Sequence, residues 1–165
     1  MEKLIYGVDP GFGRKPDGSE KKRVGLASIS TKDGSIKELH TMTFTGAIEY
    51  LKVINLHGYR VVESVVVEIP RTKKSWHGIK PTTLVNIGMG LAAMQIMVAM
   101  LDLYWGQDKV VKVYPCDTDL THEQFTLLTG WTGKVCSQDA RNAAMMALNY
   151  YKGAYRAKQQ QEKSK

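Results

Sequence analysis

Two apolar runs of this 165-residue chain end in a carboxylate. The first, Leu-Ile-Tyr-Gly-Val-Asp over residues 4–9, is followed by a Pro-Gly pair, and the second, over 64–70, reads Ser-Val-Val-Val-Glu-Ile-Pro. Short apolar runs bounded by turn-forming residues predict strands that are buried on both faces. A charge at the end of a buried strand is costly unless a partner compensates it. Asp9 and Glu68 are therefore the first candidates for a functional site.

The rest of the chain shows an initial hairpin followed by alternating strand and helix patterns. Two strand patterns are joined by a Lys-Asp-Gly turn at 32–34, and a helical pattern separates each later strand from the one before it. This order predicts an α/β fold in which helices cover one mixed sheet. The expected strands are 4–9, 23–31, 35–44, 64–70 and 109–115, and the expected helices are 45–58, 81–104, 119–130 and 137–158.

The longest apolar stretch, 87–103, is short for a membrane span and is expected to be a buried helix, so no membrane partner is expected. The first residues lack the pattern of a signal peptide. Cys116 and Cys136 lack metal-ligand spacing, which favours reduced thiols. These features predict a cytoplasmic protein, in the host cytoplasm if the source is a phage or virus.

Basic residues outnumber acidic ones and give a formal net charge of +7 and an isoelectric point near 9.4. The excess gathers in three segments, 14–23, 71–80 and 152–165. One basic cluster is ordinary on a soluble surface, but three clusters, two of which flank the acidic candidates, favour a polyanionic partner. Contacts with phosphates gain free energy by releasing counterions. The charge distribution therefore favours nucleic-acid binding.

Asp9 and Glu68 meet at one edge of the sheet if their strands are neighbours, and ligands collect at this edge in open α/β folds. Two close carboxylates repel each other unless a cation lies between them. Oxygen ligands favour a hard divalent ion, above all Mg²⁺, and Asp139, early in the last predicted helix, supplies a third ligand. Two such ions support phosphodiester hydrolysis. Taken singly, each acid can also be an ordinary turn or helix-end residue.

Several motifs follow one another between residue 4 and about residue 150. They are Gly-Val-Asp-Pro-Gly (7–11) with Val-Gly-Leu-Ala-Ser-Ile (24–29), Val-Val-Val-Glu-Ile-Pro (65–70), the glycine-containing helix 84–97, and Ser-Gln-Asp-Ala-Arg-Asn (137–142). Together they resemble the RuvC-type Holliday junction resolvases of the RNase H-like superfamily, in a divergent member of phage, viral or organellar type. The resemblance implies an RNase H-like fold, with a five-stranded mixed sheet, the first three strands antiparallel, and helices on both faces.

The resemblance also implies a role for each acidic residue. Asp9 would bridge two Mg²⁺ ions, for which Mn²⁺ can substitute, while Glu68 would bind one ion and Asp139 the other. The next carboxylate of the family falls on Asn142, whose amide oxygen can bind a metal but adds no charge. Lys134 is a candidate for stabilising the transition state.

The identity of the fourth metal ligand stays open at this point. Asp117, Asp119 or Glu123 can complete the site in place of Asn142, and spacing alone does not decide among them.

The segments beside the proposed site supply candidate contacts with nucleic acid. The loop 13–23 is longer than the first turn usual in the family, and we expect it to contact the DNA backbone. Its cations, and those after Glu68, can hold phosphates, while an aromatic ring can stack on an unpaired base. The candidates are Phe12, Arg14, Lys15, Lys21, Lys22, Arg23, Arg71, Lys73, Lys74 and Trp76.

The leading hypothesis is a Mg²⁺-dependent, structure-selective DNA endonuclease that nicks four-way or other branched DNA in pairs. The resemblance implies a homodimer with helix 84–103 at its interface and no small-molecule cofactor. The alternatives are an RNase H-like nuclease for structured RNA or hybrids, and a non-catalytic nucleic-acid-binding module. The nuclease domain is expected over 1–152, followed by a basic tail, 153–165, whose composition permits disorder.

Overall fold

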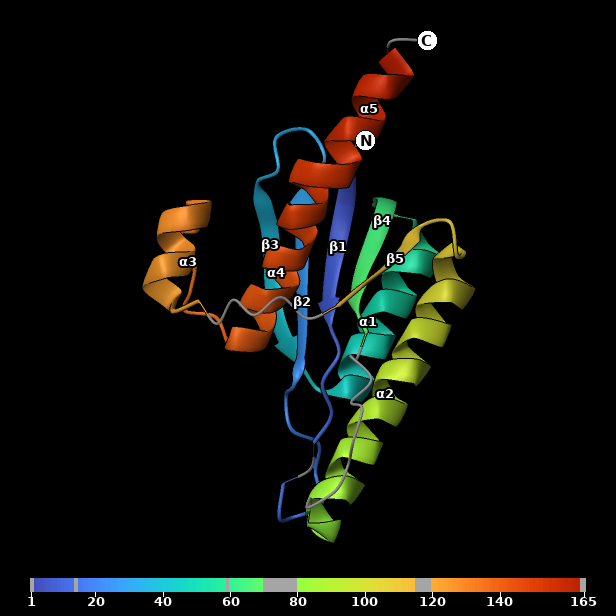
Figure 1. The fold of residues 1–165 in the computed structure, drawn as a ribbon, viewed down its shortest axis with the longest axis vertical. Helices are drawn as coiled ribbons and strands as arrows, with labels where there is room; N and C mark the ends of the chain where they lie inside the picture. Colours follow the sequence, from blue (N-terminus) through green and yellow to red (C-terminus); the bar gives the residue numbers. More distant parts are fainter. Residues whose placement is uncertain (1, 14, 59, 70–79, 115–119, 164–165) are drawn as a thin grey trace.

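The computed structural model describes residues 2–13, 15–58, 60–69, 80–114 and 120–163. Its centre is a five-stranded sheet in the order β3-β2-β1-β4-β5 (Figure 1). The first three strands are antiparallel, whereas β4 and β5 run parallel to β1. The predicted mixed sheet is confirmed. The strands are β1 Lys3–Asp9, β2 Val24–Ser30, β3 Ile36–Met42, β4 Val61–Glu68 and β5 Val110–Val113.

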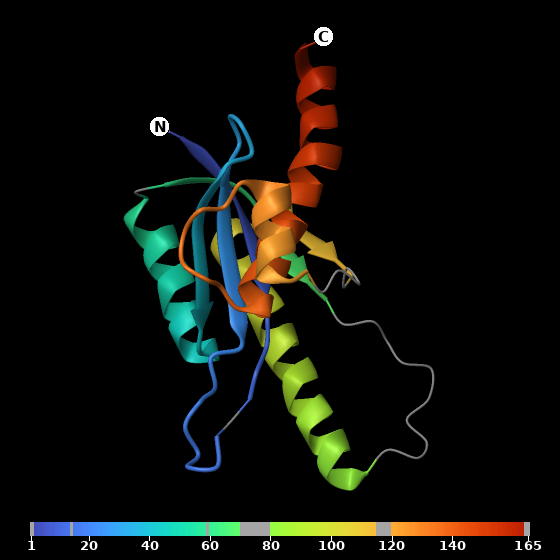
Figure 2. The same cartoon turned by 90° about the vertical axis from the view of Figure 1, so that its left-hand side faces the viewer.

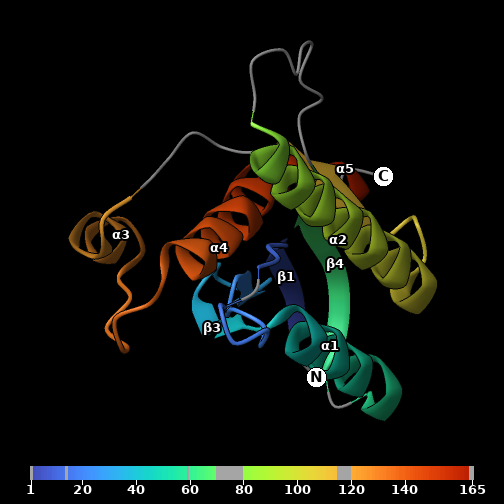
Figure 3. The same cartoon turned by 90° about the horizontal axis from the view of Figure 1, so that it is seen from below.

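Helices cover both faces of the sheet, as expected. Figure 3 shows the sheet between α4 on one side and α1 on the other. Side chains alternate between the faces, so Tyr6 and Val8 of β1 pack with α1 and α2 while Ile5 packs with α4. The helices are α1 Phe44–His57, α2 Pro81–Trp105, α3 His122–Thr129 and α4 Gln138–Tyr150, followed by a π-helical turn, η1 Tyr151–Tyr155, and α5 Arg156–Lys163.

The helical structure at the C-terminus extends past the expected domain boundary at residue 152. Tyr155 is buried and stacks on Tyr151 with ring centroids 6.0 Å apart. α5 then projects away from the sheet, at the end opposite the loop between β1 and β2 (Figure 2). The first part of the predicted tail is thus helical and partly packed in the core.

The expectation that the long apolar helix is buried was wrong. α2 is long and apolar enough to cross a membrane, with a mean hydropathy of 1.9, yet only 17% of its most apolar window is buried. Met97 and Leu101 face the core, whereas Ile96 and Leu103 are exposed. The apolar residues of α2 are distributed around the whole helix, and the sheet covers only one side of it. The apolar residues on the other side are therefore exposed.

The backbone of α4 lies directly on two strand glycines. A side chain at Gly7 of β1 would collide with the Ala143 carbonyl, and one at Gly25 of β2 would collide with the Asp139 carbonyl. Gly25 is also the cross-strand partner of Asp9. The glycines therefore let the first turn of α4 approach the carboxyl end of β1 without an intervening side-chain layer.

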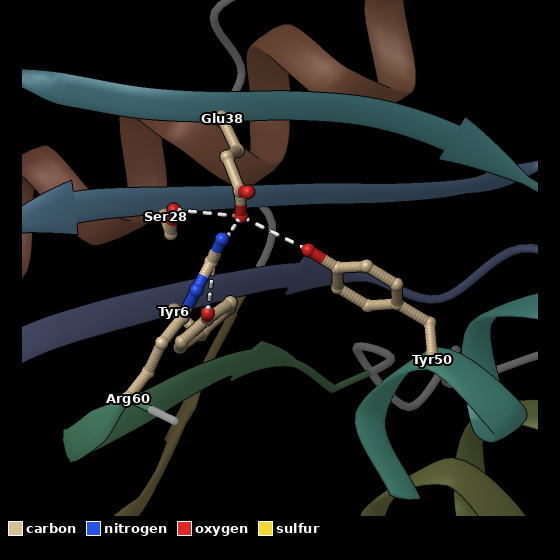
Figure 4. Close-up of polar contacts among 5 residues, drawn as sticks. All are labelled: Tyr6, Ser28, Glu38, Tyr50 and Arg60. Carbon is tan, nitrogen blue, oxygen red and sulfur yellow. Dashed lines mark hydrogen bonds and ion pairs between the residues drawn. The ribbon is translucent and has the colours of Figure 1, made fainter. Parts of the chain in front are cut away.

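A polar cluster on the opposite face ties α1 and the start of β4 to the sheet (Figure 4). Glu38 of β3 accepts hydrogen bonds from Tyr50 (2.9 Å), Ser28 (3.3 Å) and Arg60. Arg60 also donates to the buried Tyr6 hydroxyl at 3.2 Å. Burial alone would raise the pKa of Glu38, but the bonds from Arg60 and Tyr50 outweigh it and lower that pKa.

Replacing Gly25 with Ala should lower the free energy of unfolding by about 1–3 kcal/mol, since the added methyl group meets backbone that cannot turn aside. Urea unfolding measures this loss. Gly90→Ala is the matched control, because Gly90 lies in open space within α2. There alanine should leave the stability unchanged or raise it by up to about 1 kcal/mol. A Gly25→Ala protein as stable as wild type would contradict the close packing of α4.

Replacing Glu38 with Gln should cost about 1 kcal/mol at pH 7, a modest value because solvent screens the partly exposed Arg60. The folded-state pKa of Glu38 lies below its unfolded value, so its contribution is present above the unfolded pKa and disappears as the pH falls through the folded-state pKa. Urea midpoints of the two proteins should therefore converge in acid. Glu2→Gln, in an exposed pair with Lys37, serves as the control.

Candidate functional site

Three carboxylates come together at the carboxyl ends of β1 and β4. Asp9 and Glu68 are the last residues of these neighbouring parallel strands, and the residues just before them, Val8 and Val67, are paired in the sheet. Asp139 lies in the first turn of α4, above Gly25. The expected meeting of the two strand ends with the start of the last helix is thus observed.

The start of α4 is well defined by its cap. Ser137 is the N-cap residue, and its hydroxyl accepts a hydrogen bond from the Ala140 N–H at 3.2 Å. The same hydroxyl lies 2.5 Å from the Thr41 hydroxyl of β3. The helix start is therefore tied to the sheet beside the carboxylates, and its N–H groups favour negative charge at Asp139.

Asp9 carries the most perturbed charge of the site. Burial, the nearby Glu68 and, more weakly, Asp139 raise its pKa from 3.8 to about 7, although a hydrogen bond from Asn142 opposes the shift. Burial also raises the pKa of Glu68. In the protein without a metal ion, Asp9 is consequently only partly ionised at neutral pH.

Among the described residues, Arg23 and Arg141 act on Asp139 and not on Asp9. Burial raises the pKa of Asp139, but the charges of Arg23 and Arg141 partly oppose this effect. Arg23 immediately precedes β2 and stands two residues before Gly25. Alternation along the strand places the two residues on the same face of the sheet. The arginines therefore place positive charge on the Asp139 side of the site.

Asn142 also reaches the site, but its orientation differs from that of a metal ligand. Its side chain lies close enough to Asp9 to oppose the rise in the pKa of that carboxyl, which is the effect of a hydrogen-bond donor. Its Oδ1 atom accepts a hydrogen bond from Gln138 Nε2 at 2.8 Å. The oxygen that was expected to bind metal is thus occupied by a neighbour on the same helix.

The donor set fits a hard divalent cation by its chemistry. Three carboxylates in a partly buried site supply oxygen ligands, and a cation would offset the burial and the repulsion that together raise the pKa of Asp9. Among the described residues, no three acidic, histidine or cysteine side chains are already grouped tightly enough to enclose an ion. Binding would therefore require these carboxylates to turn toward the ion.

The described residues of the loop between β1 and β2, 10–13 and 15–23, form a basic hairpin closed by backbone hydrogen bonds. Lys21 N donates to Gly13 O and Lys15 N to Ser19 O, both at 2.8 Å. Glu20 accepts hydrogen bonds from the Thr45 hydroxyl (2.8 Å) and amide (3.2 Å) at the start of α1. Figures 1 and 2 show this loop and the first turns of α2 extending in the same direction, beyond the carboxyl ends of β1 and β4.

Two hollows adjoin this hairpin. One of about 370 Å³ lies between the loop and α2 and is lined by Phe12, Gly13, Lys21, Arg23, Asn86 and Met89. The other, of about 710 Å³, is lined by Lys15, Ser19, Glu20, Lys21, Lys22, Arg23 and Thr43. The described cations that were predicted to bind nucleic acid are thus brought together, and the Phe12 ring packs edge-on against Phe44, with centroids 6.0 Å apart.

Two of the described candidates, Lys134 and Glu123, do not join the carboxylates. Lys134 is exposed in the loop before α4, and in the part of the chain that the structure describes its side chain makes no hydrogen bond or ion pair with the carboxylates. Glu123 lies in the first turn of α3. The predictions at Arg14, Arg71, Lys73, Lys74, Trp76, Asp117 and Asp119 fall outside the described residues.

Sequence reasoning missed four residues that shape the site. In the sequence analysis Gly7 and Gly25 are named only within motifs, although a glycine such as Gly7, two places before a strand-end acid, is a signal for close backbone packing on the strand. Gln138 and Arg141 were not considered. Gln138 stands four residues before Asn142 and three before Arg141, and this spacing is the available signal, because residues three or four apart meet on a helix surface.

Replacing Asp9 with Asn should stabilise the metal-free protein at pH 8 and not at pH 4. The folded-state pKa of Asp9, about 7, lies above its ordinary value of 3.8, so the stability associated with the protonated form is present in acid and is lost as the pH rises through about 7. The full shift corresponds to at most about 4 kcal/mol. Urea unfolding with a chelator present measures the difference, and equal stability of the two proteins at pH 8 would contradict the shift.

Comparison with known proteins gives a structural likeness without a sequence match. No protein-family model and no curated protein sequence matches the chain. Thermus thermophilus RuvC in complex with a Holliday junction substrate is similar, with a TM-score of 0.53, 13% identity and coverage of 93% of this chain and 95% of that one. A second Thermus thermophilus RuvC structure gives a TM-score of 0.50, 12% identity and coverage of 93% and 96%.

These likenesses extend over nearly the whole of both chains, and the number and directions of the strands agree with the expected architecture. The chain therefore has the RNase H-like fold of the RuvC Holliday junction resolvases.

Proposed function

We propose that the protein is a Mg²⁺-dependent, structure-selective DNA endonuclease that cuts four-way or other branched junctions. The observation that carries the proposal is the gathering of Asp9, Glu68 and Asp139 at one sheet edge of a RuvC-type fold. A neighbour with this fold is a RuvC in complex with a Holliday junction substrate. The basic hairpin beside the carboxylates supports a polyanionic substrate.

The three carboxylates would hold the metal, with Asp9 between the other two. Two bound Mg²⁺ ions would supply an activated water and stabilise the leaving 3′ oxygen of the phosphodiester. Asp9 must ionise to serve as a ligand, and its pKa of about 7 allows this near neutral pH. Mn²⁺ should substitute because it accepts the same oxygen ligands.

The surface next to the carboxylates would hold the DNA backbone. Arg23 is close enough to Asp139 to oppose the rise in the pKa of that carboxyl, and it also lines both hollows. It can therefore bind the phosphate next to the one that is cut. Lys15, Lys21 and Lys22 would position the following phosphates. Phe12 would present its ring to an unpaired base where strands exchange.

A homodimer would match a substrate with two-fold symmetry. Paired sites can nick opposed strands, and a shared isologous interface requires the same surface on both chains. The exposed apolar residues of α2, such as Val85, Ile96 and Leu103, provide a surface that is suited to such a contact. The same proposal places the protein in the cytoplasm, in association with nucleic acid.

Two other functions remain to be separated from this one. An RNase H-like nuclease for structured RNA or hybrids would use the same metal chemistry. A non-catalytic binding module would use the basic hairpin alone, and the replacement of the family's next acid by Asn142 is the observation that favours it.

The test is to incubate the protein with a labelled four-way DNA junction, a matched DNA duplex and a structured RNA in Mg²⁺. Symmetric paired nicks in the junction are expected. Asp9→Asn and Glu68→Gln should each slow cleavage at least about 100-fold, since each removes a charged ligand. Glu63→Gln is the matched control, because Glu63 lies on the same strand and pairs with Lys3 at 2.9 Å away from the site.

Three results would decide against the proposal. Cleavage of RNA alone would favour the alternative nuclease. Junction binding without cleavage in either Mg²⁺ or Mn²⁺ would favour the binding module. Cleavage that persists in excess chelator would contradict a metal-dependent reaction.

A further inference from the structure

A directional chain of hydrogen bonds runs along the first turns of α4 to Asp9. Arg141 donates from Nε to the Leu120 carbonyl at 2.8 Å and from Nη1 to the Cys136 carbonyl. Its third donor, Nη2, bonds Gln138 Oε1 at 2.6 Å. Gln138 Nε2 donates to Asn142 Oδ1 at 2.8 Å. The other end of the Asn142 amide lies close enough to Asp9 to oppose the rise in the pKa of that carboxyl.

The chemistry of arginine determines the direction of this chain. A guanidinium has donors and no acceptor, so the Gln138 atom that faces Arg141 must be the oxygen. The nitrogen of Gln138 therefore faces Asn142, and the Asn142 atom that meets it must in turn be the oxygen. The NH₂ group of Asn142 is left to face Asp9, which is an acceptor when ionised.

Turning Asn142 over would leave two mismatched contacts. Its NH₂ group would meet the NH₂ group of Gln138, and its oxygen would face the Asp9 carboxylate. In each contact, two donors or two acceptors would face each other in place of a hydrogen bond. Such a loss is costly because Gln138 and Asn142 are partly buried. Gln138 cannot turn in response, because Arg141 is itself held by two backbone carbonyls from outside the helix.

We propose that Asn142 is a positioning residue that holds Asp9 by donating a hydrogen bond, and that Gln138 and Arg141 keep it in this orientation. The inference rests on the proposed metal site. It assigns the ligands to three carboxylates and gives the fourth position a neutral donor. Such a donor orients Asp9 without adding a negative charge to a site that already holds the carboxylates of Glu68 and Asp139.

The test measures Mn²⁺ binding by calorimetry in wild type, Gln138→Met, Asn142→Ala and the double variant. Gln138→Met preserves side-chain length but breaks the chain, and should weaken Mn²⁺ binding about 10-fold, the lower end for residues that orient a ligand. In the Asn142→Ala background the same change should have no further effect, because Gln138 acts only through Asn142. Asn149→Met, an exposed site on α4, is the matched control and should bind Mn²⁺ as wild type does.

A second readout needs no metal. In the ¹⁵N spectrum of the metal-free protein, the Asn142 side-chain amide should shift in Gln138→Met and in Asp9→Asn but not in Asn149→Met. Thermal unfolding shows that each variant is folded.

Each contrary result has a separate meaning. Unchanged Mn²⁺ affinity in Gln138→Met, or additive losses in the double variant, would overturn the positioning role. A wild-type protein that binds no Mn²⁺ would contradict both this inference and the proposed metal chemistry. A protein that binds Mn²⁺ as described but leaves junctions intact would contradict only the proposed function.

Discussion

The direct contact between the α4 backbone and the strand glycines is the constraint on which the site depends. Ordinary side chains at Gly7 and Gly25 would push the helix away from the sheet. Asp139 would then leave the neighbourhood of Asp9, although both residues would keep their places in the sequence. The alanines of α4 that face the sheet, Ala143 and Ala147 among them, complete this close packing. The distance between the acids is therefore determined by residues that carry no functional group.

Electrostatics distinguishes the acids that this packing brings together. Asp139 has two arginines nearby, whereas Asp9 has two acidic neighbours and the amide of Asn142. In the proposed metal site, a cation would gain most from contact with Asp9, whose negative charge is the least compensated by the described residues. The same asymmetry explains why a neutral donor beside Asp9 is compatible with the site, since another acid there would increase the repulsion.

The sequence predicted the fold and the neighbouring ends of the strands that carry Asp9 and Glu68, because both follow from local patterns. Apolar runs ending in Asp9 and Glu68, and a Ser137 cap before Asp139, are short-range signals that survive in the folded chain. The burial of α2 could not be predicted, because an apolar composition does not say which surface covers it. The orientation of Asn142 depends on a chain of three side chains and two distant carbonyls, which spacing alone does not reveal.

The anchoring of the basic hairpin affects the entropy of binding. Glu20 holds the loop against the first turn of α1, and Asp17 closes the turn within it by accepting hydrogen bonds from the Ser19 amide (2.8 Å) and hydroxyl (2.6 Å). These acids reduce the positive charge of the loop, but they restrict its backbone before any partner arrives. Conformational entropy that a free loop would lose on binding is thus lost during folding. A less positive but preorganised loop can bind a phosphate backbone as well as a more highly charged, flexible one, and with a weaker dependence on salt.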